Sequence, residues 1–421
     1  LGIVIIIGSG IGGLSCAGLL SRVGKRVLVL EQHYIAGGCT HTFEDKGYEF
    51  DTGIHYVGNI KKRSAVLDLI TKPTIKWDKM GTKENGYVYD EIVIGDKKYN
   101  LKAGEKGYLE LINKHFPEEI ENVKRYLKYV KKVSKKDVFF LLKIIQNRWV
   151  ANILSRCFSN RFFKHTQETA LEVVRRFTTN EDLQALLLGQ FGDYGKTPSK
   201  ESFFIHSSIV NHYFEGGWYP RGGTSTIACN IIPIIEKNGG AVLVGKAVQE
   251  IMIENNKAVG VKMKNGDIIT SNNVVSACGV PNTWKKLVPR KYVPDTLLQK
   301  IDTLGLSYSS IYAFIGMEGS PEELKLRSSN IWHWTNKDYD KMIEDFQNDP
   351  EKAPMPMFIG FPCAKDSEWS KKYPGKSNAV ILTMTRFEDF EQWKDEKQGR
   401  RSKEYQKKKN MYKERILNEG L

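Results

Sequence analysis

The sequence predicts an α/β fold in which a parallel-sheet domain is interrupted by a second, mixed α+β domain that is partly helical. Three observations favour this fold. The chain opens on an unbroken β-branched run, Ile3–Ile7, of the kind found in strands buried on both faces of a parallel sheet. Lysine-rich sequence with helical periodicity then occupies residues 106–190. Strand patterns return at about Phe203, so we expect the first domain to be split along the chain.

The loop after the first strand matches a Rossmann-type dinucleotide-binding unit. Gly8, Gly10 and Gly13 stand at GxGxxG spacing, with Ser9 and an extra glycine, Gly12, between them. In such a loop the first glycine allows the turn from strand to helix, and the second lets a pyrophosphate approach the backbone. The third glycine lets helix and strand pack closely, and the N-terminus of the helix attracts the anion.

Glu31 completes this dinucleotide-binding pattern. Gly24 is placed to cap the helix, and Arg26–Leu30 predicts a second buried strand that leads directly into Glu31. A carboxylate at this offset can accept hydrogen bonds from the ribose hydroxyls of an ADP group. No arginine stands in its place, which argues against a 2′-phosphate at the site.

Length and cysteine spacing indicate a folded protein of two domains. The chain has 421 residues, of which 41% are hydrophobic. Its six cysteines form no CxxC pair, which favours free thiols and predicts neither a disulfide framework nor a metal site. No run of about 18 apolar residues occurs, so we expect no segment of this chain to cross a bilayer. The chain starts on the first strand, and we expect any targeting segment to lie upstream of it.

The positive charge is concentrated in one stretch. Between Asn122 and His165 there are twelve Lys and Arg and one acid, Asp137, which gives a net charge of +11 out of +14 for the chain. Helical spacing also aligns six apolar residues there: Val138, Leu141, Leu142, Ile145, Trp149 and Ile153. A basic amphipathic helix suits a peripheral, anionic membrane surface, and a solvated helical face is the alternative. No motif supports a nucleic-acid partner.

The second half of the sheet domain follows the basic stretch. We expect a helix at Thr224–Asn238, followed by strands at Ala241–Val244, Ala247–Ile253, Val259–Met263, Ile268–Thr270 and Val274–Gly279. Further strands are expected at Ser309–Met317, Met357–Gly360 and Ala379–Thr385. The sequence therefore divides into a dinucleotide-binding domain, residues 1–105 and 215–300, and a substrate domain, residues 106–214 and 301–421.

Several longer segments resemble a known family. GSGIGGLSCAGLL, GGCTHTF, FDTGIHYVG and GGWYPRGGTSTIA are similar to segments of the all-trans-retinol 13,14-reductase (retinol saturase) family. That family belongs to the flavoprotein superfamily of phytoene desaturases and carotenoid isomerases. Further matches at SPEEL and WSKKYPGKS extend the resemblance over essentially the whole chain. The superfamily's closing TGxD-like strand and glycine-rich helix do not occur in this sequence.

The resemblance implies FAD as cofactor, with the Glu31 carboxylate on the adenosine ribose and the backbone of Val248 against adenine. Gly37, Gly38 and the Tyr219–Gly223 loop, which contains Arg221, Gly222 and Gly223, would lie along the pyrophosphate and flavin. The family reaction is saturation of the 13,14 double bond of all-trans-retinol, at the endoplasmic reticulum membrane. NADH or NADPH is a possible electron donor, and a retinoid or other isoprenoid lipid the expected substrate.

Two residues are candidates for the proton donor of such a reaction. Protonation of the polyene before hydride delivery avoids an unstabilised carbanion, because the delocalised cation can lie beside aromatic faces. His55 follows the DTGI turn expected at the flavin, and Tyr56 is the alternative. Position alone favours the alternative that this histidine merely packs the turn.

Other functions fit the same sequence. A carotenoid desaturase or isomerase would use the same fold and cofactor on a longer polyene. A non-enzymatic isoprenoid-lipid-binding protein could retain the flavoprotein fold without the cofactor. The intact glycine loop and Glu31 favour a retained cofactor.

Overall fold

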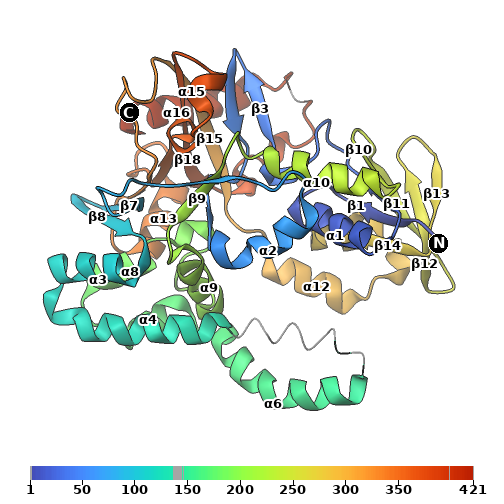
Figure 1. Ribbon diagram of the computed structural model, residues 1–421, viewed down its shortest axis with the longest axis horizontal. Helices are drawn as coiled ribbons and strands as arrows, with labels where there is room; N and C mark the ends of the chain where they lie inside the picture. The colour runs from blue at the N-terminus through green and yellow to red at the C-terminus, as the bar shows by residue number, and fades with distance from the viewer. Residues whose placement is uncertain (1, 136–144, 146, 398, 421) are drawn as a thin grey trace.

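A computed structural model describes residues 2–135, 145, 147–397 and 399–420 (Figure 1). Its first sheet has four parallel strands in the order β10-β2-β1-β14. These strands are β1 (Val4–Ile7), β2 (Val27–Leu30), β10 (Ala241–Leu243) and β14 (Asn273–Ser276). Residues near the start of the chain thus pair with residues beyond 240, which confirms the predicted parallel sheet and its interruption.

Alternate residues of β1 face two different layers. Val4 and Ile6 pack against α1 (Ile11–Arg22) and α10 (Thr226–Lys237) on one face of the sheet. Ile5 and Ile7 pack on the other face. That face is covered by an antiparallel sheet of β11 (Val248–Glu254), β12 (Lys257–Met263) and β13 (Ile268–Thr270). Burial on both faces explains why the strand is apolar at every position.

The second large sheet has six strands in the order β15-β18-β17-β16-β7-β8. They are β15 (Ser309–Glu318), β18 (Lys376–Thr385), β17 (Met357–Gly360), β16 (Asn330–Trp334), β7 (Val88–Ile94) and β8 (Lys97–Lys102). All neighbours are antiparallel except β16 and β7. From the sequence, residues 88–102 were assigned to the first domain. In the structure they belong to the sheet of the second domain, because β7 forms hydrogen bonds with β16.

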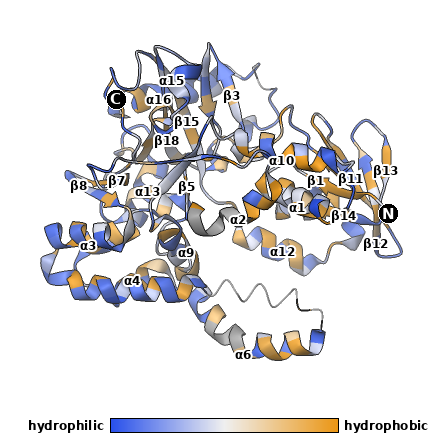
Figure 2. Cartoon of the chain, viewed as in Figure 1, coloured by the Kyte–Doolittle hydropathy of each residue, from blue (hydrophilic) through white to orange (hydrophobic). Residues whose placement is uncertain are grey.

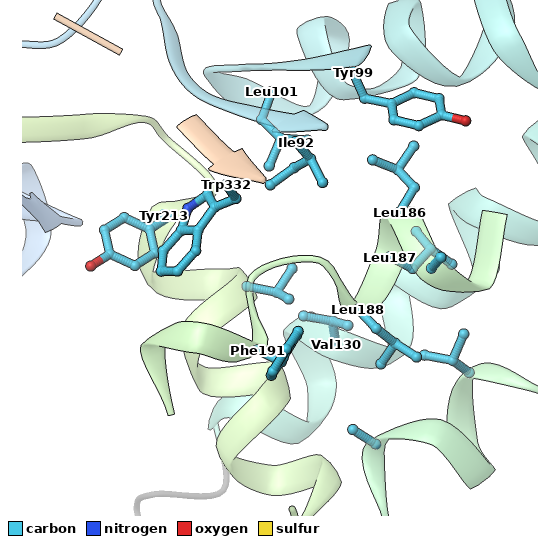
Figure 3. Packing of buried hydrophobic residues seen from close by; sticks show 14 of the residues in the cluster. Ile92, Tyr99, Leu101, Val130, Leu186, Leu187, Leu188, Phe191, Tyr213 and Trp332 are labelled. Atoms are coloured by element: carbon cyan, nitrogen blue, oxygen red, sulfur yellow. The ribbon is translucent and has the colours of Figure 1, made fainter. Parts of the chain in front are cut away.

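Helices follow on the side of β7 and β8. They are α3 (Gly104–His115), α4 (Ile120–Ser134), α6 (Arg148–Gln167), α7 (Ala170–Val174), α8 (Glu181–Leu188) and α9 (Phe203–Tyr213). Helix α3 contacts β8, α8 contacts β7, and α4, α6 and α7 contact α9. Figure 3 shows how Val130 of α4, the leucines of α8 and Phe191 meet Ile92 of β7 in one apolar cluster. Five aromatic residues that precede the Tyr219–Gly223 loop are also part of this core: Phe191, Phe203, Phe204, Tyr213 and Phe214.

Short elements connect the two sheets. They include β3 (Thr42–Asp45), β4 (Tyr48–Asp51), β5 (Val57–Gly58), β6 (Trp77–Lys79), β9 (Gly217–Pro220) and α2 (Ile60–Ile70). The later helices are α11 (Val280–Asn282), α12 (Asp295–Leu304), α13 (Tyr339–Asn348), α14 (Pro362–Lys365), α15 (Trp369–Lys372) and α16 (Lys403–Gly420). β5 and β6 both pair with β9, which brings residues 57–79 beside the Tyr219–Gly223 loop.

Helix α6 extends from the body of the molecule, with polar and apolar segments alternating along it (Figure 2). Trp149 near its start is 72% exposed. Val138, Leu141 and Leu142 of the predicted amphipathic run lie outside the described residues. Among the helices of the described ranges, none combines the length and apolar character needed to cross a membrane.

Candidate functional site

The N-terminus of α1 borders space that the described residues leave open. Gly10 is the N-cap residue, its cap carries no side-chain hydrogen bond, and the first turn contains no acidic residue. A Cβ atom built on Gly10 or Gly12 would meet no described heavy atom within 4 Å. Because the first amides of a helix lack partners within the helix, they can donate to a phosphate placed here.

Gly8 and Gly13 form the tight turn that aims this helix. Gly8 has a φ of +98°, in the region that favours glycine. A Cβ atom on Gly13 would lie 2.1 Å from the carbonyl oxygen of Gly8, so no other residue fits without moving the strand. The structure thus confirms the close helix–strand packing that the spacing predicts.

The Glu31 carboxylate lies beside this loop. It accepts hydrogen bonds from the backbone N–H and hydroxyl of Ser9, at 2.9 and 2.8 Å, and from the N–H of His33 at 2.8 Å. Partial burial opposes ionisation, but the hydrogen bonds from His33 and Ser9 hold the pKa of Glu31 below its ordinary value. An ionised acceptor therefore stands at the end of β2, where the ribose of an ADP group was predicted.

Val248 is brought to the same place. The backbone N–H of Lys246 donates to the Glu31 carbonyl at 2.7 Å, which positions the start of β11 next to the end of β2. A groove of about 790 Å³ is lined by Gly12, by the end of β14 and by residues of β11 and β12, while Glu31 and Val248 lie outside its lining. Its volume is in the range of sites that bind small molecules and cofactors.

Gly37 and Gly38 lie against the first glycine loop. The N–H of Gly37 donates to the Ser9 carbonyl at 3.2 Å. A Cβ atom on Gly38 would lie 2.9 Å from the Cα of Gly10. The two glycine-rich segments therefore meet, as expected if both follow one pyrophosphate.

The Tyr219–Gly223 loop is fixed by carboxylates. The buried Asp51 accepts hydrogen bonds from the Tyr219 hydroxyl and the Thr224 hydroxyl, each at 2.7 Å. Burial raises the pKa of Asp51 to about 6. This pairing joins the DTG turn to the loop that sequence reasoning assigned to the same site.

Arg221, Gly222 and Gly223 make protein contacts of their own. The Arg221 guanidinium donates to Asp78 Oδ1 at 2.6 and 3.1 Å, and the Gly222 N–H donates to Asp366 Oδ1 at 2.9 Å. A Cβ atom on Gly223 would lie 2.9 Å from Glu49 Oε1. In this structure Arg221 therefore serves to anchor the loop through Asp78.

A cavity of about 290 Å³ lies beyond the DTGIHY turn. The Ile54 N–H donates to the Cys39 carbonyl at 2.9 Å, so this turn is attached to the Gly37–Gly38 segment. Aromatic side chains dominate the cavity walls: Tyr56, Tyr213, Tyr308, Tyr312, Trp332 and Phe358. Such flat apolar walls suit an extended conjugated chain.

His55 lines the cavity as an uncharged ring. It is 9% exposed, and neither ring nitrogen has a hydrogen-bond partner among the described residues. Burial and the nearby Lys365 ammonium lower the pKa of His55 to about 3. A ring that is neutral at physiological pH is poorly suited to the predicted role of proton donor.

Sequence reasoning missed a buried polar network behind the cavity. The Lys365 ammonium donates to Asn330 Oδ1 at 2.5 Å, and the Asn330 amide donates to Asp90 Oδ1 at 2.9 Å. Tyr56, the second predicted donor, lies within hydrogen-bond distance of Asp90 and Asp193. These residues come from distant parts of the chain, so no local spacing reveals them.

Comparison with known proteins identifies the family. Residues 11–401 match the family described as flavin containing amine oxidoreductase. An all-trans-retinol 13,14-reductase of Danio rerio is 39% identical over 98% of this chain, which spans 70% of that protein. The protein of the same name from Homo sapiens is 37% identical over 97% of this chain and 70% of its own length. This chain belongs to the all-trans-retinol 13,14-reductase family. It is an FAD-dependent oxidoreductase, as the sequence predicted.

Two further relatives bear on the alternatives. A protein of Danio rerio named inactive all-trans-retinol 13,14-reductase is 35% identical over 99% of this chain and 70% of its own length. A chloroplastic prolycopene isomerase of Daucus carota is 25% identical over 98% of this chain and 65% of its own length. The isomerase is thus the more distant relative.

Solved structures share the fold. An oxidoreductase from Methanosarcina mazei superposes with a TM-score of 0.62 at 16% identity, over 94% of this chain and 82% of that chain. Putrescine oxidase superposes with a TM-score of 0.59 at 13% identity, over 92% of this chain and 77% of that chain. These likenesses confirm the predicted fold class.

The residues present fit an FAD. The amides of α1 are uncapped beside an open space, and Glu31 is an ionised acceptor at the adjoining strand end. Gly37 and Gly38 pack against the Ser9–Gly10 part of the glycine loop. This combination matches the anionic pyrophosphate and the ribose hydroxyls of the cofactor.

Proposed function

We propose that this protein saturates the 13,14 double bond of all-trans-retinol, or the corresponding bond of a closely related retinoid. The observation that carries the proposal is the aromatic cavity attached to the glycine-rich loops through Ile54 and Cys39. It occurs in a chain 39% identical to a protein named all-trans-retinol 13,14-reductase. When bound, the reduced flavin supplies the hydride equivalent of the saturation.

The protein's own residues orient the polyene and exclude water. Tyr213 and Trp332 are buried and line the cavity, which restricts an extended chain to few orientations. Their π-faces also favour positive charge that develops on the polyene after protonation. Gly10, Glu31 and Val248 would hold the ADP end of the cofactor, and Gly37 and Gly38 its pyrophosphate.

The electron donor for the flavin is proposed to be NADH or NADPH, bound transiently. The sequence carries a single dinucleotide fingerprint, which we assign to FAD. Anaerobic mixing of the holoenzyme with each nucleotide, followed by flavin absorbance, tests this. Bleaching by neither nucleotide would exclude both as direct donors.

We also propose that α6 docks peripherally on an anionic membrane, which for this family would be the endoplasmic reticulum. Trp149, Ile153 and Phe163 are 72%, 42% and 47% exposed. Their spacing places them within one side of an α-helix. The local excess of lysine and arginine adds electrostatic attraction to anionic lipid. Direct delivery of a water-insoluble retinoid from a membrane fits the proposed activity.

One experiment separates this function from its alternatives. The protein with bound FAD is reduced anaerobically and incubated with all-trans-retinol or with a carotenoid, and the products are separated by chromatography. A dihydro-retinol saturated at one bond supports the proposal, whereas desaturated or isomerised carotenoid supports the phytoene desaturase or isomerase alternative. A preparation without flavin absorbance and without product supports an isoprenoid-lipid-binding protein.

A further inference from the structure

The hydroxyl of Tyr56 lies between two carboxyl groups. Its oxygen is 2.9 Å from Asp90 Oδ2 and 3.1 Å from Asp193 Oδ2. A phenol carries one hydrogen and can donate it to one acceptor at a time. The second contact is therefore a hydrogen bond only if the carboxyl on that side carries a hydrogen of its own.

The surrounding donors decide which carboxyl that is. Asp90 accepts hydrogen bonds from the Asn330 amide at 2.9 Å and the Gln190 amide at 3.0 Å, in addition to Tyr56. Several donors on one carboxylate favour its ionised form. For Asp193, Tyr56 is the hydrogen-bond partner seen in the described part of the chain. Asp193 can thus donate to the Tyr56 oxygen while Tyr56 donates to Asp90.

Asp193 is also the carboxyl group that faces the cavity. Asp193 and Tyr56 both line it, whereas Asp90 is fully buried behind them. Among the described lining residues Asp193 is the one acid. His55 also lines the cavity, but burial and the Lys365 ammonium lower its pKa to about 3, and a neutral imidazole is a far weaker acid than a carboxylic acid.

We propose that Asp193 is held as a carboxylic acid and delivers the proton in the double-bond saturation; this inference rests on the proposed function. The O–H bond of Asp193 breaks, and a C–H bond forms with the electron pair of the double bond. The resulting polyenyl cation is reduced at its other carbon by the hydride equivalent of the reduced flavin. Asp193 remains as a carboxylate, stabilised by a hydrogen bond from Tyr56, and regains a proton from solvent when the product leaves.

The electrostatic surroundings agree with this assignment. Burial, followed by the neighbouring Asp90 carboxylate, raises the pKa of Asp193 well above its ordinary value, and the Tyr56 hydrogen bond opposes that rise only in part. The other titratable groups that interact with Asp193 are phenols: Tyr89, Tyr194 and Tyr213. Burial also raises the pKa of Asp90, but three hydrogen bonds, from Asn330, Gln190 and Tyr56, and the Lys365 ammonium oppose that rise. The charges on each side therefore keep the proton on Asp193.

The test replaces the acid by its amide. Asp193→Asn keeps the size of the side chain and can still donate to Tyr56, but it has no transferable proton. With FAD content unchanged, we expect retinol saturation to fall by about 10²–10⁴-fold. The exposed Asp96→Asn is the matched control and should keep wild-type turnover. Turnover of Asp193→Asn within about threefold of wild type would overturn the inference.

An infrared measurement on protein without substrate separates this inference from the proposed function. Protein labelled with ¹³C at the aspartate carboxyls should show a protonated-carboxyl band at neutral pH that Asp193→Asn removes and Asp96→Asn keeps. Persistence of the band in Asp193→Asn would overturn the inference, even if retinol is saturated. Loss of the band with no saturation by wild type would overturn the proposed function instead. In Asp193→Glu the new carboxyl is not labelled, so the labelled band should again be absent. Turnover of this variant should stay within about tenfold of wild type. Asp193→Glu serves as the deciding variant if the amide variant does not fold.

Discussion

The buried Lys365 ammonium donates a hydrogen bond to the backbone carbonyl of His55 at 3.0 Å. Residues 310 positions apart are thus joined directly behind the cavity wall. The same ammonium donates to Asn330, so one cation supports both the DTGIHY turn and the network that ends at Tyr56. Burial lowers the pKa of Lys365 to about 8, while Asp51 and Asp90 oppose that shift.

The lowered pKa of Lys365 predicts that the unfolding free energy depends on pH in a way that a variant with a neutral side chain at this position would not show. Because the pKa of Lys365 is lower in the folded state, the unfolded chain binds more protons between about pH 8 and the ordinary lysine value of about 10.4. The unfolding free energy of wild type relative to Lys365→Met should therefore rise as pH increases through that window. Urea unfolding at several pH values measures it, with the 84% exposed Lys371 changed to Met as the control. If this difference in unfolding free energy stays constant or falls with pH, burial does not lower the pKa of Lys365 in the folded protein.

Gly10→Val should abolish flavin binding. The branched side chain would fill the space in front of α1 that the described residues leave open, where the pyrophosphate must approach the backbone. Gly2→Val, also without neighbours within 4 Å of its Cβ, is the control. Flavin absorbance of the purified proteins gives the answer, and a full flavin complement in Gly10→Val would contradict the assignment of this loop.

Glu31→Ala should weaken FAD binding by about 1.5–3 kcal/mol, because a charge-assisted hydrogen bond to the ribose is lost. The change also frees the Ser9 and His33 N–H groups that Glu31 accepts from. Glu31→Gln separates these effects, since the amide oxygen can still accept while the charge is gone. Titration of the apoproteins with FAD measures the affinity, and equal affinity in all three proteins would remove Glu31 from the site.

Much of the fold was predictable because its signals are local. The Ile3–Ile7 run depends on adjacent residues alone. So does the turn at Asn255 and Asn256 between the predicted strands Ala247–Ile253 and Val259–Met263, where both asparagines have the positive φ values of a tight hairpin turn. The sequence did not predict β16, because one of its buried residues is the polar Asn330. The side chain of Asn330 can be buried there because it accepts a hydrogen bond from Lys365 and donates one to Asp90, both distant in the sequence. Hydrogen bonds between residues so far apart cannot be predicted from a short stretch of sequence.

The candidate site divides in the same way. The glycine loop and Glu31 fall within 31 residues, and the structure brings them together as their spacing predicts. The expected place of Arg221 along the cofactor stays a prediction, and its ion pair with Asp78, 143 residues earlier, was not predicted. Asp193 has no motif around it, and its significance comes from a shared hydroxyl on Tyr56, 137 residues away.

Membrane docking through α6 predicts a specific loss. Trp149→Ser should lower binding to vesicles that contain anionic lipid, on the order of tenfold, because a large exposed apolar side chain no longer enters the interface. Leu304→Ser, at a 71% exposed position on α12, is the matched control. Co-sedimentation at low and high salt measures the effect. Equal binding of both variants and wild type would assign α6 to a solvated face.

His55 provides the sharpest comparison between the donor expected from sequence and the donor inferred from structure. If His55 supplied the proton, both His55→Ala and His55→Phe would lose turnover. The structure instead places a neutral ring 5.2 Å from Phe358 with no hydrogen-bond partner on its nitrogens in the described residues. Phenylalanine removes these two buried polar atoms and keeps the aromatic contact, so His55→Phe should raise the unfolding free energy by about 1 kcal/mol.

The kinetics of His55→Phe then distinguish three roles. We expect turnover to stay near the wild-type value, because Asp193 and Tyr56 remain in place. A higher KM with unchanged turnover would assign the His55 nitrogens to the substrate, for example to a retinoid hydroxyl group. If turnover instead falls by about a hundredfold or more, with flavin content unchanged and with Asp193→Asn fully active, His55 is restored as the donor. His55→Ala, which leaves space in the wall, provides the comparison for effects of packing alone.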